Sequence, residues 1–309
     1  MTCVGIDVSK SLLCCSWAGQ VREFSNDETG REALREWSFQ AKTWCMEATG
    51  RFHEGAANFA HRHGLRCLVV NPGLAKKYLG FVASRGKTDK IDALALERLA
   101  EREGENLREY RPVPEQIAHA RDILVRRRSL VESRVSLQQV AQETGDPHGR
   151  LSQAIDAILE SQQALEKDLV KVLKGFDGYE RLLSIPGIGP LSAAVLVCAL
   201  ERGEFPTSDS LVAFAGLDPR PRDSGKHRGK RSLSHQGDAQ LRTILFMAAR
   251  AGSRVQTWKP YYQSQKSKGL STTEATVILA RKLIRVAWKV YRQGTPFTPK
   301  TQTTLDMQT

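Results

Sequence analysis

TCVGID, residues 2–7, is the stretch that decides the fold of this chain. It has the apolar alternation of a β-strand and ends in Asp7. A second β-prone run, TWCME at residues 43–47, ends in Glu47 in the same way. Open α/β sheets bind their ligands at the ends of their strands. An acid at the end of each of two buried strands therefore predicts an α/β domain with its chemistry at one edge of the sheet.

A third segment, KTDKID at residues 87–92, adds two acids to this pattern. Asp89 and Asp92 lie three residues apart and share one face of a helix. If that helix packs across the two strands, four carboxylates converge, and their repulsion calls for divalent cations, Mg²⁺ or Mn²⁺. Such ions assist both the attacking and the leaving oxygen of a phosphodiester. The predicted metal ligands are Asp7, Glu47, Asp89 and Asp92.

Each of these acids also has an ordinary structural interpretation. Asp7 and Glu47 could simply precede turns, and Asp89 and Asp92 could stabilise the N-terminus of a helix that Thr88 caps. Surface carboxylates far outnumber catalytic ones. The placement of the first two acids at the ends of runs that look buried favours the metal site.

The charge distribution indicates a polyanionic partner. The 309 residues carry a net charge of +12, with no secretion signal and no apolar run long enough to span a bilayer. Residues 1–110 hold 16 Lys and Arg against 15 Asp and Glu, whereas residues 111–309 hold 30 against 19. This fits a catalytic domain followed by one that grips nucleic acid. A basic surface that only aids solubility is the alternative.

The six cysteines form no C-x-x-C pair and fall mostly in apolar runs. This usage predicts buried, reduced thiols rather than disulfides or zinc ligands, and hence a protein of the reducing cytoplasm.

The order of elements over the front part is β-β-β-α-β-α-β-α. It is the order of the ribonuclease H-like fold, in which metal-binding acids come from the first strand, the fourth strand and a late helix. The expected segments are three strands up to about residue 24, a helix at 30–39, a strand at 43–48, a helix at 52–63, a strand at 65–70 and the helix of Asp89.

Long helices follow. Apolar residues recur every seven positions over residues 123–137 and with a 4-3 spacing over residues 151–172. GDPHG at residues 145–149 must break the helix, so that two helices form an antiparallel hairpin or a dimerising coiled coil. A basic triplet on the first helix faces either solvent or a phosphate backbone: Arg126, Arg127 and Arg128.

Two features of the remaining chain predict contact with nucleic acid. SIPGIGPL at residues 184–191 is similar to the turn of helix-hairpin-helix modules, where Gly187 and Gly189 would let backbone N–H groups approach a phosphate, although a plain tight turn uses the same residues. A basic loop then leads into a helix start, which suits an anion. Its six basic residues are Arg220, Arg222, Lys226, Arg228, Lys230 and Arg231.

Motifs spaced along the whole chain match one family in the same order. Those of the front half are VGIDVSK (4–10), EATG (47–50), VNP (70–72) and KTDKIDA (87–93). Those of the back half are IPGIGP (185–190), AGLDP (215–219), SG (224–225) and LSHQGD (233–238). From about Val4 to Phe297 the chain resembles the DEDD-type transposases of the IS-one-ten insertion sequences.

The resemblance implies a transposase, a site-specific DNA recombinase of mixed α/β and all-α class. A RuvC-like, ribonuclease H-like catalytic domain would span residues 1–112, a coiled coil for oligomerisation 113–178, and a helical transposase domain 179–297, before a flexible tail at 298–309. It further implies a homo-oligomer, dimer or tetramer, that acts on donor and target DNA under the guidance of a bridge RNA. We expect it in a prokaryotic cytoplasm, associated with the nucleoid and not with a membrane.

The family's serine nucleophile falls by position on Ser234. His235 and Asp238 stand where lysine and asparagine are common in the family. Attack by a serine leaves a 5′-phosphoserine and a free 3′-OH. Ser234 could instead cap the following helix with help from Asp238, and Ser232 is a competing nucleophile. Two other functions fit the same residues: a metal-dependent junction endonuclease that uses water, and a non-catalytic nucleic-acid-binding assembly factor.

Overall fold

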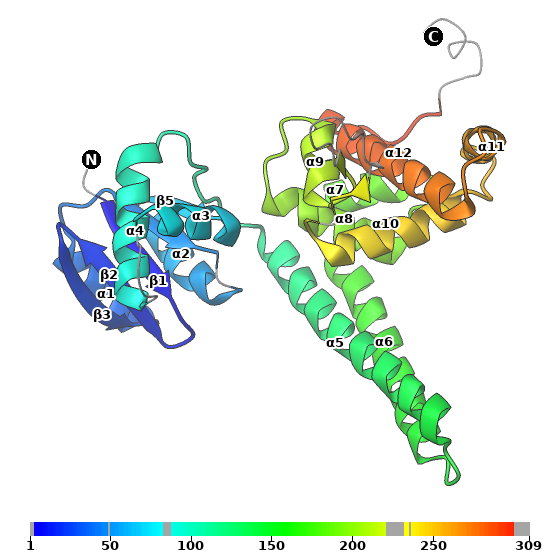
Figure 1. Cartoon of the computed structure of the whole chain (residues 1–309), viewed down its shortest axis with the longest axis horizontal. Coiled ribbons are helices and arrows are strands. Elements are labelled where there is room, and N and C mark those ends of the chain that lie inside the picture. Colours follow the sequence, from blue (N-terminus) through cyan, green and yellow to red (C-terminus); the bar gives the residue numbers. More distant parts are fainter. Residues whose placement is uncertain (1–2, 49, 83–87, 221–231, 235, 300–309) are drawn as a thin grey trace, which may run out of the picture. The chain divides into compact units, whose positions relative to one another are not determined.

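The computed structural model describes residues 3–48, 50–82, 88–220, 232–234 and 236–299. The chain divides into two units, Met1–Pro112 and Val113–Thr309 (Figure 1). The first combines a sheet with helices and the second is almost wholly helical, so the predicted mixture of α/β and α structure is confirmed. Most of the predicted basic loop and of the predicted flexible tail lies outside the described residues.

A five-stranded mixed sheet forms the centre of the first unit. Its strand order is β3-β2-β1-β4-β5, with β1 antiparallel to β2, and β1, β4 and β5 parallel to one another. The middle strand β1 contains CVGID of the TCVGID segment and continues to Val8. The bounds are β1 Cys3–Val8, β2 Leu12–Trp17, β3 Gln20–Ser25, β4 Thr43–Glu47 and β5 Arg66–Val70.

Helices cover both faces of this sheet. Even-numbered residues of β1, such as Ile6, pack with Leu34 of α1 (Glu28–Trp37) and Phe59 of α2 (Phe52–Arg62). On the other face, Cys3 and Cys45 pack with Leu96 of α4 (Asp89–Glu103). Alternate residues of a strand point to opposite faces, so the two cores follow from the period-two pattern.

Gly5 lets α4 lie directly on β1. A Cβ added there would stand 2.0 Å from the carbonyl oxygen of Ala93 and 2.3 Å from the backbone nitrogen of Glu97. Only glycine permits so close an approach of two backbones. Figure 1 shows α4 crossing the face of the sheet at β1.

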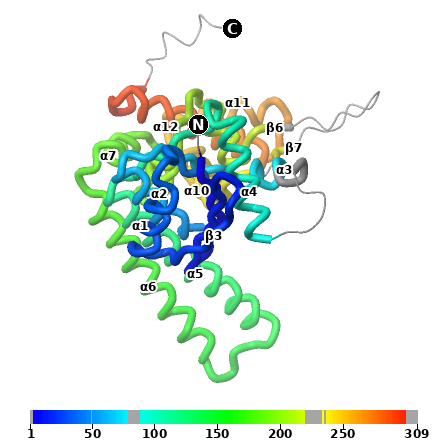
Figure 2. Tube along the Cα trace, turned by 90° about the vertical axis from the view of Figure 1, so that its left-hand side faces the viewer, coloured from blue at the N-terminus to red at the C-terminus, as the bar shows by residue number. Residues whose placement is uncertain are grey.

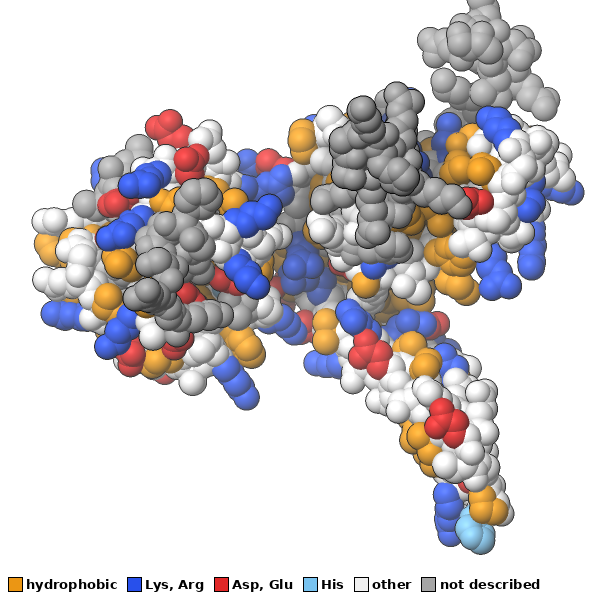
Figure 3. Space-filling model, viewed as in Figure 1, with side chains coloured by type: hydrophobic (Ala, Val, Ile, Leu, Met, Phe, Trp, Pro, Cys, Tyr) orange, Lys and Arg blue, Asp and Glu red, His pale blue; other side chains and the backbone are white. Residues whose placement is uncertain are grey.

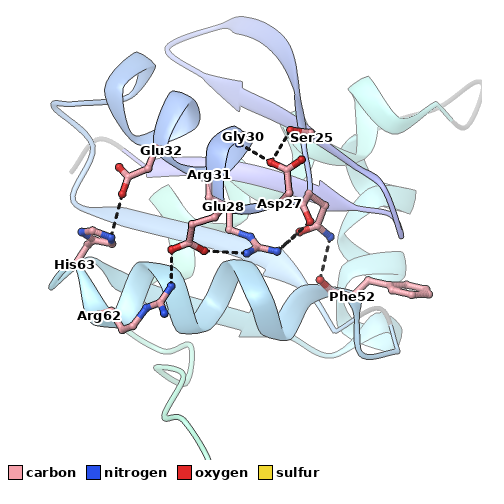
Figure 4. A network of polar contacts seen from close by, with 10 residues as sticks. Ser25, Asp27, Glu28, Gly30, Arg31, Glu32, Phe52, Arg62 and His63 are labelled. Atoms are coloured by element: carbon pink, nitrogen blue, oxygen red, sulfur yellow. Dashed lines mark hydrogen bonds and ion pairs between the residues drawn. The ribbon is translucent and has the colours of Figure 1, made fainter.

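Polar contacts join the two helices of the opposite face (Figure 4). Asp27 caps α1 by accepting a hydrogen bond of 2.8 Å from the Gly30 nitrogen, and this bond is the main reason that the pKa of its carboxyl is lowered. Glu28 then pairs with Arg31 at 3.4 Å and with Arg62 of α2 at 2.9 Å. The network fixes α1 against α2 on the face of the sheet opposite α4.

One helix adds to the sequence-based expectation. The strand expected at residues 65–70 does end at Val70, before NPG at residues 71–73, and an unexpected helix, α3 (Pro72–Val82), begins there. Proline is favoured at the first position of a helix, and the Asn71 side chain accepts a hydrogen bond of 2.8 Å from the Gly73 nitrogen. The other predicted elements of this unit are present, with ends shifted by one or two residues.

The second unit begins with a long helical hairpin. α5 (Glu115–Thr144) and α6 (Arg150–Leu173) run antiparallel, since Gln116 bonds to the Val172 carbonyl oxygen and Arg127 to Glu166. The predicted break is confirmed, and positive φ values at Gly145 and Gly149 make the turn. Figure 2 shows the hairpin extending from the other helices of its unit. Within the chain the antiparallel hairpin is thus the observed form, and dimerisation stays a prediction.

The rest of the second unit is a helical bundle around one large core. A short two-stranded ladder, β6 with β7, interrupts it. The elements are α7 Asp177–Leu183, α8 Pro190–Arg202, α9 Ser208–Phe214, β6 Pro219–Arg220, β7 Ser232–Leu233, α10 Ala239–Gly252, α11 Lys259–Ser267 and α12 Thr272–Gln293.

All six cysteines are buried and free, as predicted. Burial raises the pKa of Cys45 and that of Cys198 to about 12, so these thiols are poor nucleophiles. A helix both long and apolar enough to cross a membrane does not occur in the described part of the chain.

Candidate active site

Asp7 is the next-to-last residue of β1 and Glu47 is the last residue of β4, its parallel neighbour in the first unit. Ile6 lies opposite Met46 in the ladder, so the next step of the register sets Asp7 beside Glu47. Both acids have the same phase as Gly5 and Cys45, whose side of the sheet faces α4. Two half-buried carboxylates therefore share the carboxyl ends of β1 and β4 on the α4 face.

Asp89 and Asp92 lie in the first turn of α4. The Thr88 hydroxyl caps this helix by accepting a hydrogen bond from the Ile91 nitrogen at 3.3 Å. Asp89 is exposed, whereas the side chain of Asp92 faces inward and the residue is only 7% exposed. An acid at a helix N-terminus is favoured by the helix dipole.

The first turn of α4 lies at the same end of the sheet as Asp7. Cys14 on β2 stands directly opposite Asp7 in the ladder. Its pKa is raised to about 11, mainly by burial and further by the negative charges of Glu23, Asp7 and Asp89. Asp7 and Asp89 therefore act on one thiol from two elements. We call the four acids Asp7, Glu47, Asp89 and Asp92 the carboxylate edge.

The carboxylate edge is not a closed metal cage. No three His, Cys, Asp or Glu side chains of the described residues are grouped so that they could hold a metal ion. The donor chemistry nevertheless fits a divalent cation, because Mg²⁺ and Mn²⁺ take hard carboxylate oxygens as ligands. These side chains would have to move together around an ion.

Glu97 is a functional candidate that sequence reasoning overlooks. This carboxylate is 5% exposed on the sheet side of α4, and it accepts hydrogen bonds from the Ser16 hydroxyl at 2.5 Å and the Ala18 nitrogen at 2.8 Å. It ties α4 to the end of β2, and so fixes where the first turn of α4 lies. The available signal is a charged residue within the apolar stripe of Ala93, Leu96 and Ala100.

Ser234 of the second unit lies beside a carboxylate. The β6–β7 ladder pairs Pro219 with Leu233, and its next step sets Asp218 opposite Ser234. The Ser234 nitrogen donates to the Asp218 carbonyl oxygen at 2.9 Å, and the Ser234 hydroxyl donates to a carboxylate oxygen of Asp218. Ser232 lies in β7 opposite Arg220.

The cap interpretation of Ser234 is wrong. Asp238 is the N-cap of α10, since its carboxylate accepts a hydrogen bond of 2.9 Å from the Leu241 nitrogen. The helix begins at Ala239, so Ser234 is not at a helix start either. Before α10 begins, the chain passes close to the end of α9 at Gly237. A Cβ added there would lie 2.2 Å from the Phe214 carbonyl oxygen. Aspartate and asparagine are equally good caps, which explains why either suits position 238.

The predicted nucleic-acid residues have different environments. Arg126 is exposed, Arg128 pairs with Glu132 at 2.7 Å on its own helix, and Arg127 pairs with Glu166 across the hairpin at 2.7 Å. Arg127 therefore contributes to the structure of the hairpin. Arg220 lies in β6. The residues of the basic loop that fall outside the described part are Arg222, Lys226, Arg228, Lys230 and Arg231, and His235 does so too.

The glycine-rich turn joins α7 to α8. Gly187 has φ +88°, and a Cβ there would lie 2.9 Å from the Gly252 Cα of α10. The Trp258 indole nitrogen also donates to the Pro186 carbonyl oxygen at 2.6 Å. Gly187 thus has a packing reason to be glycine. At Gly189 an added Cβ would meet nothing within 4 Å among the described atoms, so this position can approach another molecule closely.

Comparisons with known proteins cover both units. A DEDD transposase model of the IS110 type matches residues 4–144, and the model described as "Transposase IS116/IS110/IS902 family" matches residues 179–263. A pilin gene-inverting protein of Moraxella bovis is 28% identical over 320 residues, which cover 96% of this chain and 97% of that protein.

Two further relatives match about half of the chain. A probable family 20 transposase of Pseudomonas aeruginosa is 32% identical over 162 residues, 50% of this chain and 48% of its own length. A 43.6 kDa protein of insertion element IS110 from Streptomyces coelicolor is 32% identical over 147 residues, 47% of this chain and 36% of its own length. Two family models in the order of the motifs, together with these relatives, establish that the chain belongs to the IS110 (IS-one-ten) family of DEDD transposases, enzymes that recombine DNA.

Proposed function

We propose that this transposase cuts and rejoins DNA through a 5′-phosphoserine on Ser234, with a divalent metal held by the carboxylate edge. The observation that carries the proposal is the strand register that sets Asp7 beside Glu47 on the face that α4 covers. Acids from two strands and one helix of the same unit suit phosphodiester chemistry. We also assign this unit to the ribonuclease H-like (RuvC-like) class, because β1 is central in its strand order and β2 alone runs antiparallel to the other strands.

The chain's own residues have distinct tasks in this reaction. Bound Mg²⁺ or Mn²⁺ would neutralise charge at the scissile phosphate. Asp7, Glu47 and Asp92 would hold the ion, and Asp89 would complete the set from the solvent side. The Ser234 Oγ attacks phosphorus, the bond to O3′ breaks, and a free 3′-OH is left. The phosphoserine ester conserves the bond energy, so the strand can be rejoined without a nucleotide cofactor.

We further propose that a bridge RNA directs the enzyme to donor and target DNA, and that it works as a homo-oligomer on nucleoid DNA. The net charge of +12 supports a polyanionic partner. The relative from Moraxella bovis carries the name of a gene-inverting protein, which supports site-specific strand exchange rather than cutting alone. Sequencing the RNA that co-purifies with the full chain tests the guide, and a heterogeneous pool of cellular RNA would contradict it.

The decisive experiment is the capture of a covalent protein–DNA adduct. Wild-type protein, with its co-purified RNA and Mg²⁺, should attach through Ser234 to a DNA 5′ end, and mass spectrometry should locate the phosphoryl remnant there. Ser234→Ala should lose both adduct and recombination. Ser232→Ala is the matched control and should retain both. Cleavage by Ser234→Ala without an adduct would instead identify an endonuclease that uses water.

A second arm of this experiment tests the metal. Asp7→Ala, Glu47→Ala, Asp89→Ala and Asp92→Ala should each abolish recombination and leave nucleic-acid binding largely intact, because each removes one ligand. Glu101→Ala, an exposed position on the same helix α4, is the control. Full activity in EDTA, or in any two of the four variants, would refute the metal site.

A further inference from the structure

Asp218 lies within hydrogen-bond distance of the proposed nucleophile. Its carboxylate oxygen accepts the hydrogen bond of the Ser234 hydroxyl, although the two residues are 16 positions apart in the sequence. Hydroxyls are weak nucleophiles until a neighbouring base takes their proton. The contact therefore has the geometry of a nucleophile and its proton acceptor.

The backbone holds this pair in place from both sides. The Ser234 nitrogen donates to the Asp218 carbonyl oxygen at 2.9 Å, which continues the β6–β7 ladder. Directly before Asp218, buried Leu217 is anchored to the end of α9 by a hydrogen bond of 3.1 Å to the Val212 carbonyl oxygen. Backbone hydrogen bonds at Ser234 and beside Asp218 thus orient the two side chains toward each other, as preorganisation at a reacting centre demands.

A cation stands near the same carboxylate. Arg281 of α12 interacts electrostatically with Asp218 and Asp209, which oppose the lowering of its pKa by burial and by Arg285. The Nε–H group of Arg281 is buried, and it has no hydrogen-bond partner among the residues described. The Nε–H group is covered by protein, so Arg281 acts on an incoming phosphate through its positive charge. That charge, near Asp218, favours a phosphodiester at the pair.

We propose that Asp218 is a catalytic residue that accepts the proton of the Ser234 hydroxyl during attack on DNA, and that the positive charge of Arg281 assists by attracting the phosphate. The inference rests on the proposed role of Ser234. An alternative is purely structural, in which Asp218 only closes the short ladder. If Asp218 accepts the proton, removal of its carboxylate charge slows the chemical step. If Asp218 is only structural, the rate of that step stays the same.

The proton balance of the step is complete. The Oγ–P bond forms and the P–O3′ bond breaks, and the electron pair of that bond goes to O3′, which takes a proton from water and leaves as the 3′-hydroxyl. The Ser234 proton rests on Asp218. When a 3′-hydroxyl of the exchanged strand attacks the phosphoserine, Asp218 returns the proton to Oγ and the incoming hydroxyl gives its own to water. One carboxylate thus serves as base in cleavage and as acid in rejoining.

The test compares two aspartates that both interact with Arg281. Asp218→Asn keeps a hydrogen-bond acceptor for Ser234 but accepts no proton, and it should slow adduct formation in a single turnover about 10²- to 10⁴-fold. DNA affinity and the thermal unfolding temperature should stay at wild-type values. Asp209→Asn removes an aspartate that pairs with Arg285 at 2.8 Å, and it should change the rate less than about threefold.

The outcomes separate this inference from the proposed function. Adduct formation by Asp218→Asn at the wild-type rate would overturn the role of Asp218 and leave Ser234 in place. A wild-type protein that cleaves without an adduct would refute both. DNA with sulfur in place of the bridging 3′ oxygen adds a readout that a folding defect cannot imitate. Sulfur leaves readily without a proton, so if this substrate restored the rate of Asp218→Asn, the aspartate would serve the leaving group and the assignment would fall.

Discussion

Single side chains set the position of the carboxylate edge. Gly5 allows α4 to touch β1, and the buried carboxylate of Glu97 bonds to Ser16 and Ala18 at the end of β2. Together they determine where the first turn of α4, with Asp89 and Asp92, stands over the sheet. The position of Asp89 and Asp92 relative to Asp7 therefore depends on residues outside the carboxylate edge.

Glu97 should prove to be a positioning residue. Glu97→Ala removes the acceptor of the buried Ser16 hydroxyl and of the part-buried Ala18 N–H group, and should cost about 1–3 kcal/mol of unfolding free energy. It should also raise the Mg²⁺ concentration needed for half-maximal recombination, because the first turn of α4 is no longer held in place. Glu97→Gln can bond to both groups, so it should recover most of the stability and the wild-type Mg²⁺ requirement.

Glu101→Ala on the same helix is the control for both measurements, since that residue is exposed. An unchanged Mg²⁺ requirement in a destabilised Glu97→Ala protein would mean that Glu97 serves the fold alone.

At the scale of elements, the α5–α6 hairpin carries apolar side chains that the chain itself leaves uncovered. Val135 and Val140 of α5 are 52% and 41% exposed. Figure 3 shows hydrophobic, acidic and basic side chains scattered along the hairpin surface among other polar surface. Arg127 and Glu166 fix the two helices to each other nearer the base. The outer part of the hairpin thus offers a surface through which the predicted homo-oligomer could form.

Charges at these two valines should reduce oligomerisation. Val135→Asp together with Val140→Asp would bury two carboxylates if the hairpin packs against a second copy, which is unfavourable without partners. Light scattering should then report a smaller assembly at the same protein concentration. Ser133→Asp with Ser136→Asp adds equal charge at exposed positions of α5 and should leave the mass unchanged. A wild-type mass for the valine variant would exclude this surface from the interface.

The elements also show which parts of the structure local sequence can predict. Period-two alternation and terminal acids are enough to predict β1 and β4, because each strand is buried on both faces and ends at the functional edge. α3 is not predictable in the same way, since NPG is compatible with a turn and with a helix start. The helix is favoured because Ala75 of α3 packs in one core with Leu68 and Val70 of β5. This contact joins separate elements, so the local sequence does not reveal it.

The surroundings of Ser234 are equally hard to predict from local sequence. The motif places a serine at position 234, but it carries no sign of a partner at position 218. That pairing requires two strands of two residues each to meet across a long connection. Similarly, Asp238 and Ser234 are both acceptable caps by type, and only the contact of Gly237 with the end of α9 determines where α10 begins.

At the scale of the whole molecule, charge is divided between the two parts of the chain. The net charge of +12 lies almost wholly beyond residue 110, where the sequence has 30 Lys and Arg and 19 Asp and Glu. The part that contains the carboxylate edge is near neutral. A basic partner unit can concentrate nucleic acid electrostatically without masking the acids that hold metal.

The salt dependence of binding should reveal which basic residues touch the phosphate backbone. Each phosphate contact with duplex DNA contributes about 0.9 to the slope of log affinity against log salt. If the basic loop grips DNA, changing Lys226, Arg228, Lys230 and Arg231 together to Ala should lower the slope by about 3 to 4. The control removes the same charge from the hairpin, through Ala at Arg150, Lys167, Lys171 and Lys174, and should lower it less. Equal slopes for both variants would mean that net charge alone attracts DNA, and an unchanged slope for the loop variant would place the grip elsewhere on the molecule.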